Sequence, residues 1–500
     1  MTDICGYAIL ENIYAGQVQS PNLMRVRHKC PNTDNNTILR AICAYPRWRR
    51  PRGPTAISMD DMEILQAKSQ GFGMVSIVAA GDSLATMRLS VHDDEPYTSM
   101  LRILRSADVS FTNLEMLLGD FESPPAAESG GTYAMAEPFM AEELKWMGFN
   151  LYARANNHSM DYGEGGLLST TRILNRLGLA HAGVGRNLAE ARSPAYLETK
   201  NGRMALISAS STFAAFGRAG EARRDMIGRP GVNPLRYEAK LLVPHRVMRQ
   251  LKRVFKEAGA PVRKEKGGVI SLMSLKLAGG RKSQIVTFPN EGDVKEIVAS
   301  IKDAKRQSDC VLVSLHAHEA DGVNREAPAA FMRIFCKKCL DSGADAIIGH
   351  GPHLLRGIEI YKRKPIMYSL GNFVFMNETV RFLPSEIYER YRLTWNATPA
   401  DLYDARGRKG KKDERGFRWF TYDRVYWESA IAKFTLEDGV LRELQLYPVT
   451  LGFERPRSQR GRPVLAEGRQ ARAILERLRR LSLQYGTELD IINGIGKVRP

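Results

Sequence analysis

Val75-Ser76-Ile77-Val78-Ala79-Ala80-Gly81-Asp82 is the stretch that opens the patterned part of this 500-residue chain. Its apolar and β-branched residues predict a short buried strand, and the glycine and aspartate predict a loop where that strand ends. The same combination, an apolar run that stops at polar residues, returns several times along the sequence. This repetition decides the fold class.

Predicted strands alternate with predicted helices after this first stretch. Apolar runs indicate strands at 107–115, 149–155, 204–209, 310–315 and 344–348, and helical spacing indicates helices at 96–106, 138–147, 165–177 and 328–342. Gly178 follows the third of these helices and is a suitable stop signal for it. Strands that alternate with helices of this length predict an α/β fold with packed sheets.

The predicted strands end in side chains that bind metal ions. Open α/β sheets place their sites at the carboxyl ends of strands, so we expect these side chains to gather. Carboxylate, amide and imidazole groups on separate loops suit a divalent ion such as Mn²⁺, Zn²⁺, Fe²⁺ or Mg²⁺. The set comprises Asp82, Glu115, Asn157, His158, His316, His318, Glu319, His350 and His353.

Each member of this set also has a plainer interpretation. Asp82 alone is better explained as a helix cap, and Asn157-His158 as a turn pair. His316 and His318 share a strand face by the two-residue period, although such pairs occur without metal. His350 and His353 fit a structural loop. Only the joint pattern favours a metal site.

The composition, with 43% hydrophobic and 26% charged residues, is that of a globular protein. No run approaches the roughly 20 apolar residues of a membrane-spanning helix, and residues 1–30 lack the pattern of a secretory signal. Six cysteines are too few for a disulfide scaffold. No P-loop or nucleophile-elbow motif is present. We therefore expect a reduced, cytoplasmic enzyme.

The net charge of +18 suggests an anionic partner. Residues 1–58 contribute +5 and residues 451–500 contribute +6, which leaves about +7 for the rest. The basic run at 47–50 is too short to predict nucleic-acid binding, so a solvated arm is the better interpretation.

Breaks in the pattern divide the chain into three parts. Residues 1–73 are expected to be a poorly ordered extension, 74–455 a catalytic domain, and 456–500 a basic helix and tail. The domain is expected to carry insertions near 215–305 and 376–425, the latter with a basic low-complexity run at 406–412.

Six blocks resemble, in order, those of the CapA family, which is associated with poly-γ-glutamate capsule synthesis and belongs to the calcineurin-like metallophosphoesterase superfamily. The likeness covers about residues 74–380. The blocks are Gly81-Asp82, Asn113-Leu114-Glu115, the stretch from Ala155 to Gly163, His316-Ala317-His318-Glu319, Gly349-His350-Gly351-Pro352-His353, and the stretch from Tyr368 to Phe373.

This resemblance implies a four-layer α/β/β/α sandwich with one or two divalent ions. It makes metal ligands of Asp82, Glu115, Asn157, His316, His350 and His353, with Glu115 in the bridging position. It also implies that His158 is the general acid and that Asp161 orients an imidazole. His318 and Glu319 are expected to face the substrate, and they are also the alternative ligands in place of His316. Asn372 is expected either to face the substrate with them or to hold its own loop in place.

Two departures from the phosphoesterase pattern bear on the chemistry. Leu84 stands where phosphoesterases have a histidine, and the last two histidines are three residues apart rather than two. A site with fewer ligands would hold one ion, which is unfavourable for a two-metal phosphoesterase.

The sequence therefore predicts a metal-dependent hydrolase of an anionic substrate, small or polymeric, in which a metal-activated water cleaves a γ-glutamyl-type amide or a phosphoester. Mn, Zn or Fe is the expected metal. The alternative is a non-catalytic poly-γ-glutamate capsule-assembly or polyanion-binding protein.

Overall fold

The computed structural model describes residues 73–272, 275–408 and 423–500, which belong to one compact unit. The predicted extension over 1–73 and most of the basic run at 406–412 lie outside these ranges, as does the run at 47–50. Within the described ranges, no helix combines the length and the apolar character that crossing a bilayer requires.

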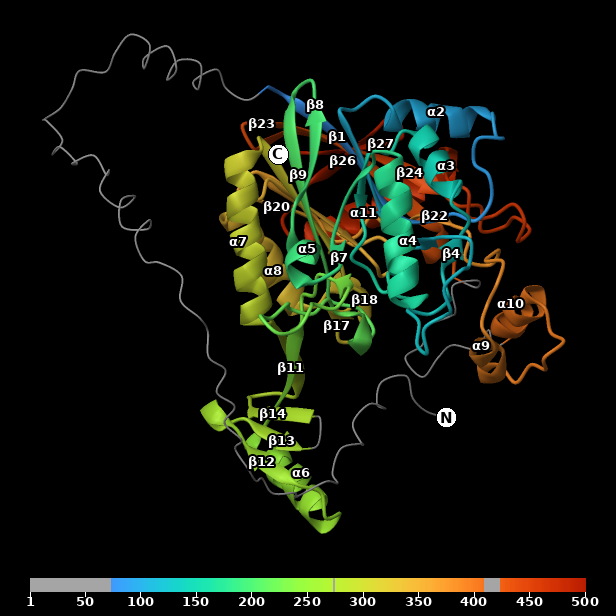
Figure 1. The fold of residues 1–500 in the computed structure, drawn as a ribbon. Helices are drawn as coiled ribbons and strands as arrows, with labels where there is room; N and C mark the ends of the chain where they lie inside the picture. Colours follow the sequence, from blue (N-terminus) through green and yellow to red (C-terminus); the bar gives the residue numbers. More distant parts are fainter. Residues whose placement is uncertain (1–72, 273–274, 409–422) are drawn as a thin grey trace, which may run out of the picture. The chain divides into compact units, whose positions relative to one another are not determined.

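The larger of two main sheets has ten strands and contains the stretch that opens the pattern (Figure 1). Strand β1 (Val75–Leu84) runs parallel to β2 and β22 and antiparallel to β23. The other strands of this ten-stranded sheet are β2 (Val109–Leu114), β5 (Leu151–Ala153), β6 (Ala180–Ala182), β22 (Asn372–Phe375), β23 (Glu428–Glu437), β24 (Val440–Thr450), β25 (Val464–Leu465), β26 (Leu489–Ile492) and β27 (Ile495–Val498).

The second main sheet has six strands in the order β20-β21-β19-β16-β9-β8. Its four central strands are parallel, and the two edge strands are antiparallel to their neighbours. The strands are β8 (Ala195–Thr199), β9 (Gly202–Ser210), β16 (Cys310–His316), β19 (Ala346–His350), β20 (Ile358–Tyr361) and β21 (Lys364–Met367).

One apolar cluster joins the two main sheets, with Ile77 and Phe111 from the first and Leu312 and Ile348 from the second. Helices α2 (Glu95–Leu104), α3 (Met140–Met147) and α4 (Gly163–Arg176) contribute to a second cluster on the larger sheet. Helices α7 (Glu291–Gln307) and α8 (Ala330–Asp341) share a third with the smaller sheet. Figure 1 shows these two helix groups on different flanks of the strands. The predicted α/β fold is confirmed.

Helix α11 (Gly468–Leu483) accounts for the basic helix predicted near the C-terminus. Its buried residues, among them Ile474, Leu475 and Leu478, join the cluster between the two main sheets.

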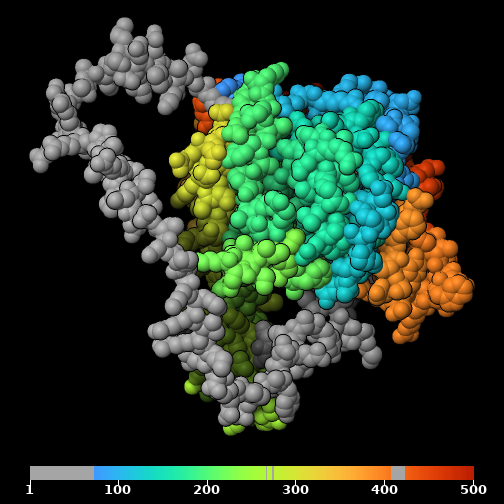
Figure 2. All heavy atoms as spheres, viewed as in Figure 1, coloured from blue at the N-terminus to red at the C-terminus, as the bar shows by residue number. Residues whose placement is uncertain are grey.

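Figure 2 shows the molecule from the same side as Figure 1. On this side residues 140–180, in teal, and residues 180–235, in green, lie next to each other.

The region expected to be an insertion at 215–305 contains a separate five-stranded sheet. Its strands are β11 (Tyr237–Val243), β12 (Val262–Lys264), β13 (Ile270–Leu272), β14 (Leu275–Gly279) and β15 (Gln284–Pro289), and helix α6 (His245–Glu257) packs on it. The expected boundary at 305 is wrong, because Val294, Ile297 and Ile301 of α7 are part of the core. The many charged residues on the exposed side of α7 make its overall composition polar, so composition alone does not reveal the apolar face.

Short elements complete the described chain. Two-stranded pairs are formed by β3 (Leu117–Leu118) with β4 (Met135–Ala136), β7 (Val184–Gly185) with β10 (Gly231–Val232), and β17 (Ala320–Asp321) with β18 (Asn324–Pro328). The short helices are α5 (Leu188–Arg192), α9 (Ser385–Arg390) and α10 (Pro399–Arg408).

Candidate metal centre

The larger sheet brings three polar residues to one level, near the ends of β1 and β2 and at the start of β22. Asp82 of β1 pairs with Asn113 of β2 and with Asn372 of β22, and β1 has a register irregularity just before Asp82. Gly81 makes this approach possible, because a Cβ at that position would lie 1.8 Å from the carbonyl oxygen of Gly371. The glycine ahead of the aspartate is thus required by the backbone that passes beside it.

The smaller sheet contributes two histidines in the same way. His316 is the last residue of β16 and pairs with His350, the last residue of the parallel strand β19. Gly351 follows His350 with φ at +111°, and a Cβ there would lie 2.9 Å from the amide nitrogen of Ala317. Both main sheets therefore direct their strand ends into one site, as the sequence predicted.

Six side chains form two groups that have the composition of metal sites. The ligand atoms of Asp82, His316 and His350 all lie within 4.8 Å of one another, and so do those of the second group, Glu115, His318 and His353. The two groups adjoin, since His353 Nδ1 lies 3.7 Å from Asp82 Oδ2 and His316 Nε2 lies 3.6 Å from Glu115 Oε1.

Hydrogen bonds hold the first group in place. Asp82 accepts a bond from Asn113 Nδ2 at 2.8 Å on one oxygen and from the amide of Gly351 at 3.0 Å on the other. His350 is tied to Ser314, whose Oγ lies 2.6 Å from its Nε2. The Nδ1 atoms of His316 and His350 lie 2.9 Å apart. These partners fix the carboxylate and the imidazole rings in the manner of supporting groups in metal sites.

Burial shifts the pKa values of these groups in the direction that metal binding would relieve. It raises the pKa of Asp82 to about 7 despite the bonds from Asn113 and Gly351. The pKa of Glu115 lies well above its usual value because of burial and the charge of Asp82. Burial also lowers the pKa of His350 to about 3 and that of His353 to about 4, so these rings are neutral at pH 7. Two closely spaced carboxyls surrounded by neutral imidazoles fit a cation.

Two buried oxygens at the site lack a hydrogen-bond partner within the described part of the chain. They are Glu115 Oε1 and Asn157 Oδ1. Buried oxygens of this kind are rare and call for an explanation such as an ion or water. Asn157 donates its amide group to the carbonyl of Gly130 at 3.0 Å, which leaves its oxygen as the atom available for coordination. Both residues were predicted to be ligands.

His158 and Asp161 form a short polar contact beside the ligand groups. His158 Nδ1 lies 2.6 Å from Asp161 Oδ2. Asp161 also accepts hydrogen bonds from the amides of Gly130 and Ala134, at 3.1 and 2.8 Å. The loop before the aspartate therefore fixes its carboxylate against the imidazole of His158. The charge of His158 also contributes, after burial and other imidazoles, to lowering the pKa of His316 and His318, which places it beside the ligand groups.

Three residues expected to face the substrate have other positions. His318 belongs to the second ligand group, and its Nε2 lies 3.1 Å from His316 Nε2. Glu319 turns away, because its carboxylate accepts hydrogen bonds from Ser211 and Thr212. Asn372 is fully buried and uses its amide on His353 and on the carbonyl of Tyr426. The structure thus has no free polar atom of Asn372 for a substrate.

Sequence reasoning missed two asparagines and an arginine that position the site. Asn113 joins Asp82 to Asn156, whose Nδ2 donates to Asn113 Oδ1 at 3.2 Å and to the carbonyl of Leu114 at 2.8 Å. Asn113 of β2 lies two residues before Glu115, which follows the last residue of that strand, and this spacing was an available signal. Arg356 is fully buried and donates to the carbonyls of Ala317, His318 and Arg325, a role with no sequence signal.

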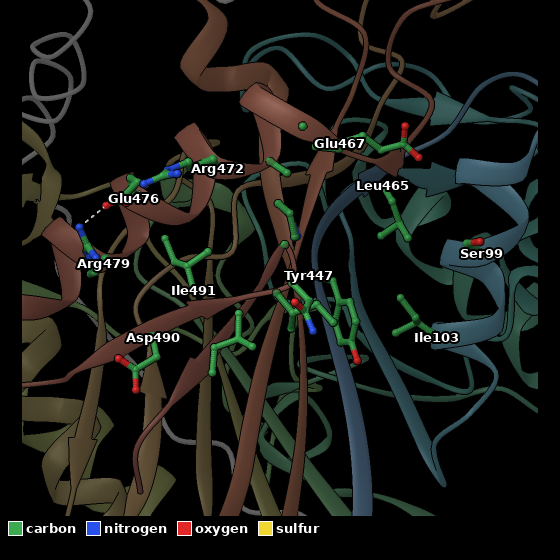
Figure 3. Close-up of a pocket in the computed structure, with 18 of the residues that line it drawn as sticks. Ser99, Ile103, Tyr447, Leu465, Glu467, Arg472, Glu476, Arg479, Asp490 and Ile491 are labelled. Atoms are coloured by element: carbon green, nitrogen blue, oxygen red, sulfur yellow. Dashed lines mark ion pairs between the residues drawn. The ribbon is translucent and has the colours of Figure 1, made fainter.

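A cavity of about 1330 Å³ lies elsewhere, between α2, α11 and strands β24 to β27 (Figure 3). Tyr447, Leu465 and Ile491 face it, and Arg479 forms an ion pair with Glu476 at its rim. None of the candidate ligands lines this cavity.

Comparisons with known proteins identify the family of the chain. The family model described as "Bacterial capsule synthesis protein PGA_cap" matches residues 73–377. The chain belongs to this family. PGA_cap is part of the metallophosphoesterase-like superfamily, so the resemblance inferred from the six sequence blocks is confirmed.

Relatives of this PGA_cap protein include a close match of unassigned role. The "Uncharacterized protein y4sH" of Sinorhizobium fredii is 37% identical over 429 residues, which cover 85% of this chain and 93% of the relative. The "PGA biosynthesis protein CapA" of Bacillus subtilis is 26% identical and covers 68% and 74%. The "Capsule biosynthesis protein CapA" of Bacillus anthracis is also 26% identical and covers 59% of each chain.

Proposed function

We propose that this PGA_cap protein is a metal-dependent hydrolase of an anionic substrate in polyglutamate capsule metabolism. The observation that carries the proposal is the pair of ligand groups beside the His158–Asp161 contact. The scissile bond is a γ-glutamyl-type amide or a phosphoester, and the capsule-related names of the relatives support the amide.

The proposed ligands are Asp82, His316 and His350 for one ion and Glu115, His318 and His353 for another, with Asn157 Oδ1 beside them. Imidazole and carboxylate donors suit Mn²⁺, Zn²⁺ or Fe²⁺. Divalent ions at such a site lower the pKa of bound water and polarise an oxygen of the substrate. Two groups of three ligands support two ions, although the departures at Leu84 and His350 had suggested one.

His158 is proposed as the general acid that protonates the leaving group. Its ring has one nitrogen directed at Asp161, which leaves the other for the substrate. Asp161 keeps the ring in one orientation. His158, Asn157 and His353 retain slight exposure, and His318 is partly exposed, whereas His316 and His350 are fully buried. Substrate is therefore proposed to enter on the side of His158.

A second candidate function is a non-catalytic role in capsule assembly by binding polyanion. The name "Probable polyglutamine synthesis accessory protein", carried by a Mycobacterium tuberculosis relative that is 26% identical over 286 residues, favours this reading. The net charge of +18 is compatible with it. In that case binding of polyglutamate would survive the loss of Glu115 and His353, because screened charge attraction needs no metal.

The four-layer α/β/β/α arrangement is part of the proposal. It is supported by the apolar cluster shared by the two main sheets and by the helix-lined clusters with α2–α4 and with α7–α8. We also propose 74–455 as the catalytic domain and 456–500 as its C-terminal helix and tail, with insertions at 237–289 and 376–425.

Metal content of the purified protein, measured by mass spectrometry, is the first test. We expect close to two equivalents of Mn, Zn or Fe in the parent, and loss of at least one in Glu115→Ala. Glu190→Ala, which removes an exposed-surface carboxylate partner of Arg186, is the matched control and should keep the metal. Turnover is then measured on γ-glutamyl anilides and on phosphoesters. A full metal complement without turnover of either class would favour the binding function, and no metal after reconstitution would contradict the proposal.

A further inference from the structure

Half of the net charge of the chain lies in the small sheet and helix formed by residues 237–289. This segment, here called the basic module, holds twelve lysines and arginines against three glutamates, a net charge of +9 out of +18. The net charge of about +7 between residues 59 and 450 is therefore concentrated in the basic module, and the other residues of that range together are close to neutral.

The basic module has its own apolar core, and the apolar face of α6 packs against it. Met248 packs with Val243, Leu272 and Leu277, and further residues of α6 lie against the same cluster. The module is joined to the main body through Tyr237, whose ring stacks on Phe331 at 4.5 Å, and through a hydrogen bond from the amide of Phe331 to Thr287. The charged face of α6 is consequently directed to solvent.

Four cations form a line along that exposed face. Arg246, Arg249, Arg253 and Lys256 follow one another at intervals of three, four and three residues, which places them on one side of a helix. At about 1.5 Å of rise per residue the line is about 15 Å long, with a charge roughly every 5 Å. We call these four residues the cationic stripe.

The stripe has no acidic partners within the described residues. Of the module's three glutamates, Glu238 and Glu265 form ion pairs with Lys240 and Lys276. The third, Glu257, follows Lys256 in the sequence and forms no ion pair among the described residues. All four stripe side chains are exposed, and none forms an ion pair in the part of the chain that the structure describes. A row of uncompensated like charges is costly for a protein to keep unless an anionic partner neutralises it.

We propose that the cationic stripe binds a linear polycarboxylate and so holds a polymer substrate at a second place, away from the metal ligands. The proposal rests on the proposed function, because it specifies a polymeric rather than a small anionic substrate. A γ-linked polyglutamate has two more backbone carbons per residue than an α-polypeptide, whose residues span at most ~3.3–3.6 Å, so its α-carboxylates recur at roughly 6 Å and several can meet the stripe together.

Two other polyanions fit the module less well. A lipid surface takes up helices through an apolar face, and the apolar residues of α6 other than the exposed Val254 pack on the module's own core. Single-stranded nucleic acid binds through stacking on available aromatic rings. Tyr237 and Phe288 are exposed in part, but one face of Tyr237 stacks on Phe331 and Phe288 lies under Lys240, while Phe255 packs against the core.

The test measures binding of labelled poly-γ-glutamate to the full chain in chelator, at about 50 mM and at higher salt. Without metal no turnover interferes, so the result is independent of the hydrolase proposal. We expect the triple variant Arg249→Gln, Arg253→Gln and Lys256→Gln to bind about tenfold more weakly at low salt, the loss expected for three exposed charge contacts. The difference should shrink as salt screens the charges.

The matched control removes three exposed cations from another helix. Lys295, Lys302 and Arg306 of α7 are exposed and form no ion pair among the described residues, and their change to Gln should alter binding less than twofold. Equal losses in both triple variants would overturn the stripe. So would wild-type binding that is tighter to duplex DNA or to phosphatidylglycerol vesicles and that the stripe variant abolishes.

Discussion

Asn372 holds His353 at two atoms. Its Oδ1 lies 2.9 Å from His353 Nδ1, and its Nδ2 donates to the main-chain carbonyl of His353 at 3.3 Å. His353 has φ at +60°, a left-handed conformation that is uncommon for a residue other than glycine. An asparagine from β22 thus stabilises a strained backbone that carries a candidate ligand.

Replacement of Asn372 by alanine should therefore weaken metal binding. We expect a 10- to 100-fold loss of affinity, roughly the effect of removing a group that orients a ligand. Competition with a chromophoric chelator measures the change. Asn150→Ala is the control, since Asn150 also bonds main-chain groups of a neighbouring strand, through Ser110 and Asp108. Equal metal affinities in the two variants would show that Asn372 does not position His353.

The His158–Asp161 contact predicts a separation of catalysis from metal binding. His158→Gln should lower kcat by roughly 10²–10⁴-fold while the metal content stays at the parent level, because the residue supplies a proton rather than a ligand. Asp161→Asn should lower kcat in the same direction, with a smaller effect. A His158→Gln protein that loses its metal would reassign this histidine as a ligand.

Gly81 should tolerate no side chain. Alanine there would bring a Cβ to 1.8 Å from the Gly371 carbonyl oxygen, so one of the two strands must shift. We expect a loss of about 3 kcal/mol or more in the free energy of unfolding, measured in urea. Gly279→Ala is the control, because the nearest atom to its Cβ would be a carbon of His245 at 3.6 Å. Similar stabilities for the two variants would contradict the close approach.

Glu143 predicts a pH dependence of stability. Burial opposes its ionisation, but hydrogen bonds from the amides of Ser90 and Leu89 outweigh burial and lower its pKa below the usual value. A group with a lowered folded-state pKa stabilises the fold above its unfolded pKa, near 4.3 for Glu, and the effect disappears as pH falls through the folded value.

Glu143→Gln should accordingly be less stable than the parent by about 1–3 kcal/mol at pH 7, the range for hydrogen bonds to a charged group. The gap should narrow as the pH is lowered from about 5 towards 3. Urea unfolding at several pH values measures it. A gap that is constant with pH would mean that the carboxylate charge contributes nothing.

The sequence predicted the elements that carry the ligands because each has a clear local signal. The strand predicted from Cys310 is present as β16, and the helix predicted to end before Gly178 is present as α4, both close to their expected limits. Strand ends in parallel sheets meet by topology, so Asp82 and His316 could be placed in one site without knowing the intervening loops.

What the sequence could not predict depends on contacts between distant residues. The role of Arg356 follows from backbone atoms that approach only in the folded chain, and the same kind of contact decides that Asn372 holds the loop of His353, one of its two expected roles. The sequence offered Glu319 as an alternative ligand beside His318. In the structure its carboxylate instead accepts hydrogen bonds from the hydroxyl groups of Ser211 and Thr212, which follow another strand. Total charge, likewise, concealed a concentration of cations that becomes meaningful only once α6 orients them.

The two main sheets each supply part of the ligand set, and this has a consequence for assembly of the protein. Asp82 and Glu115 belong to segments more than 200 residues away from His316 and His318. An ion held by both sets acts as a cross-link between halves that meet only after the core has closed. The unfolded chain offers no comparable site, so metal uptake becomes a late step and the bound ion raises resistance to heat and denaturant in proportion to its affinity. Chelation should then loosen the join between the sheets before it disturbs either sheet alone.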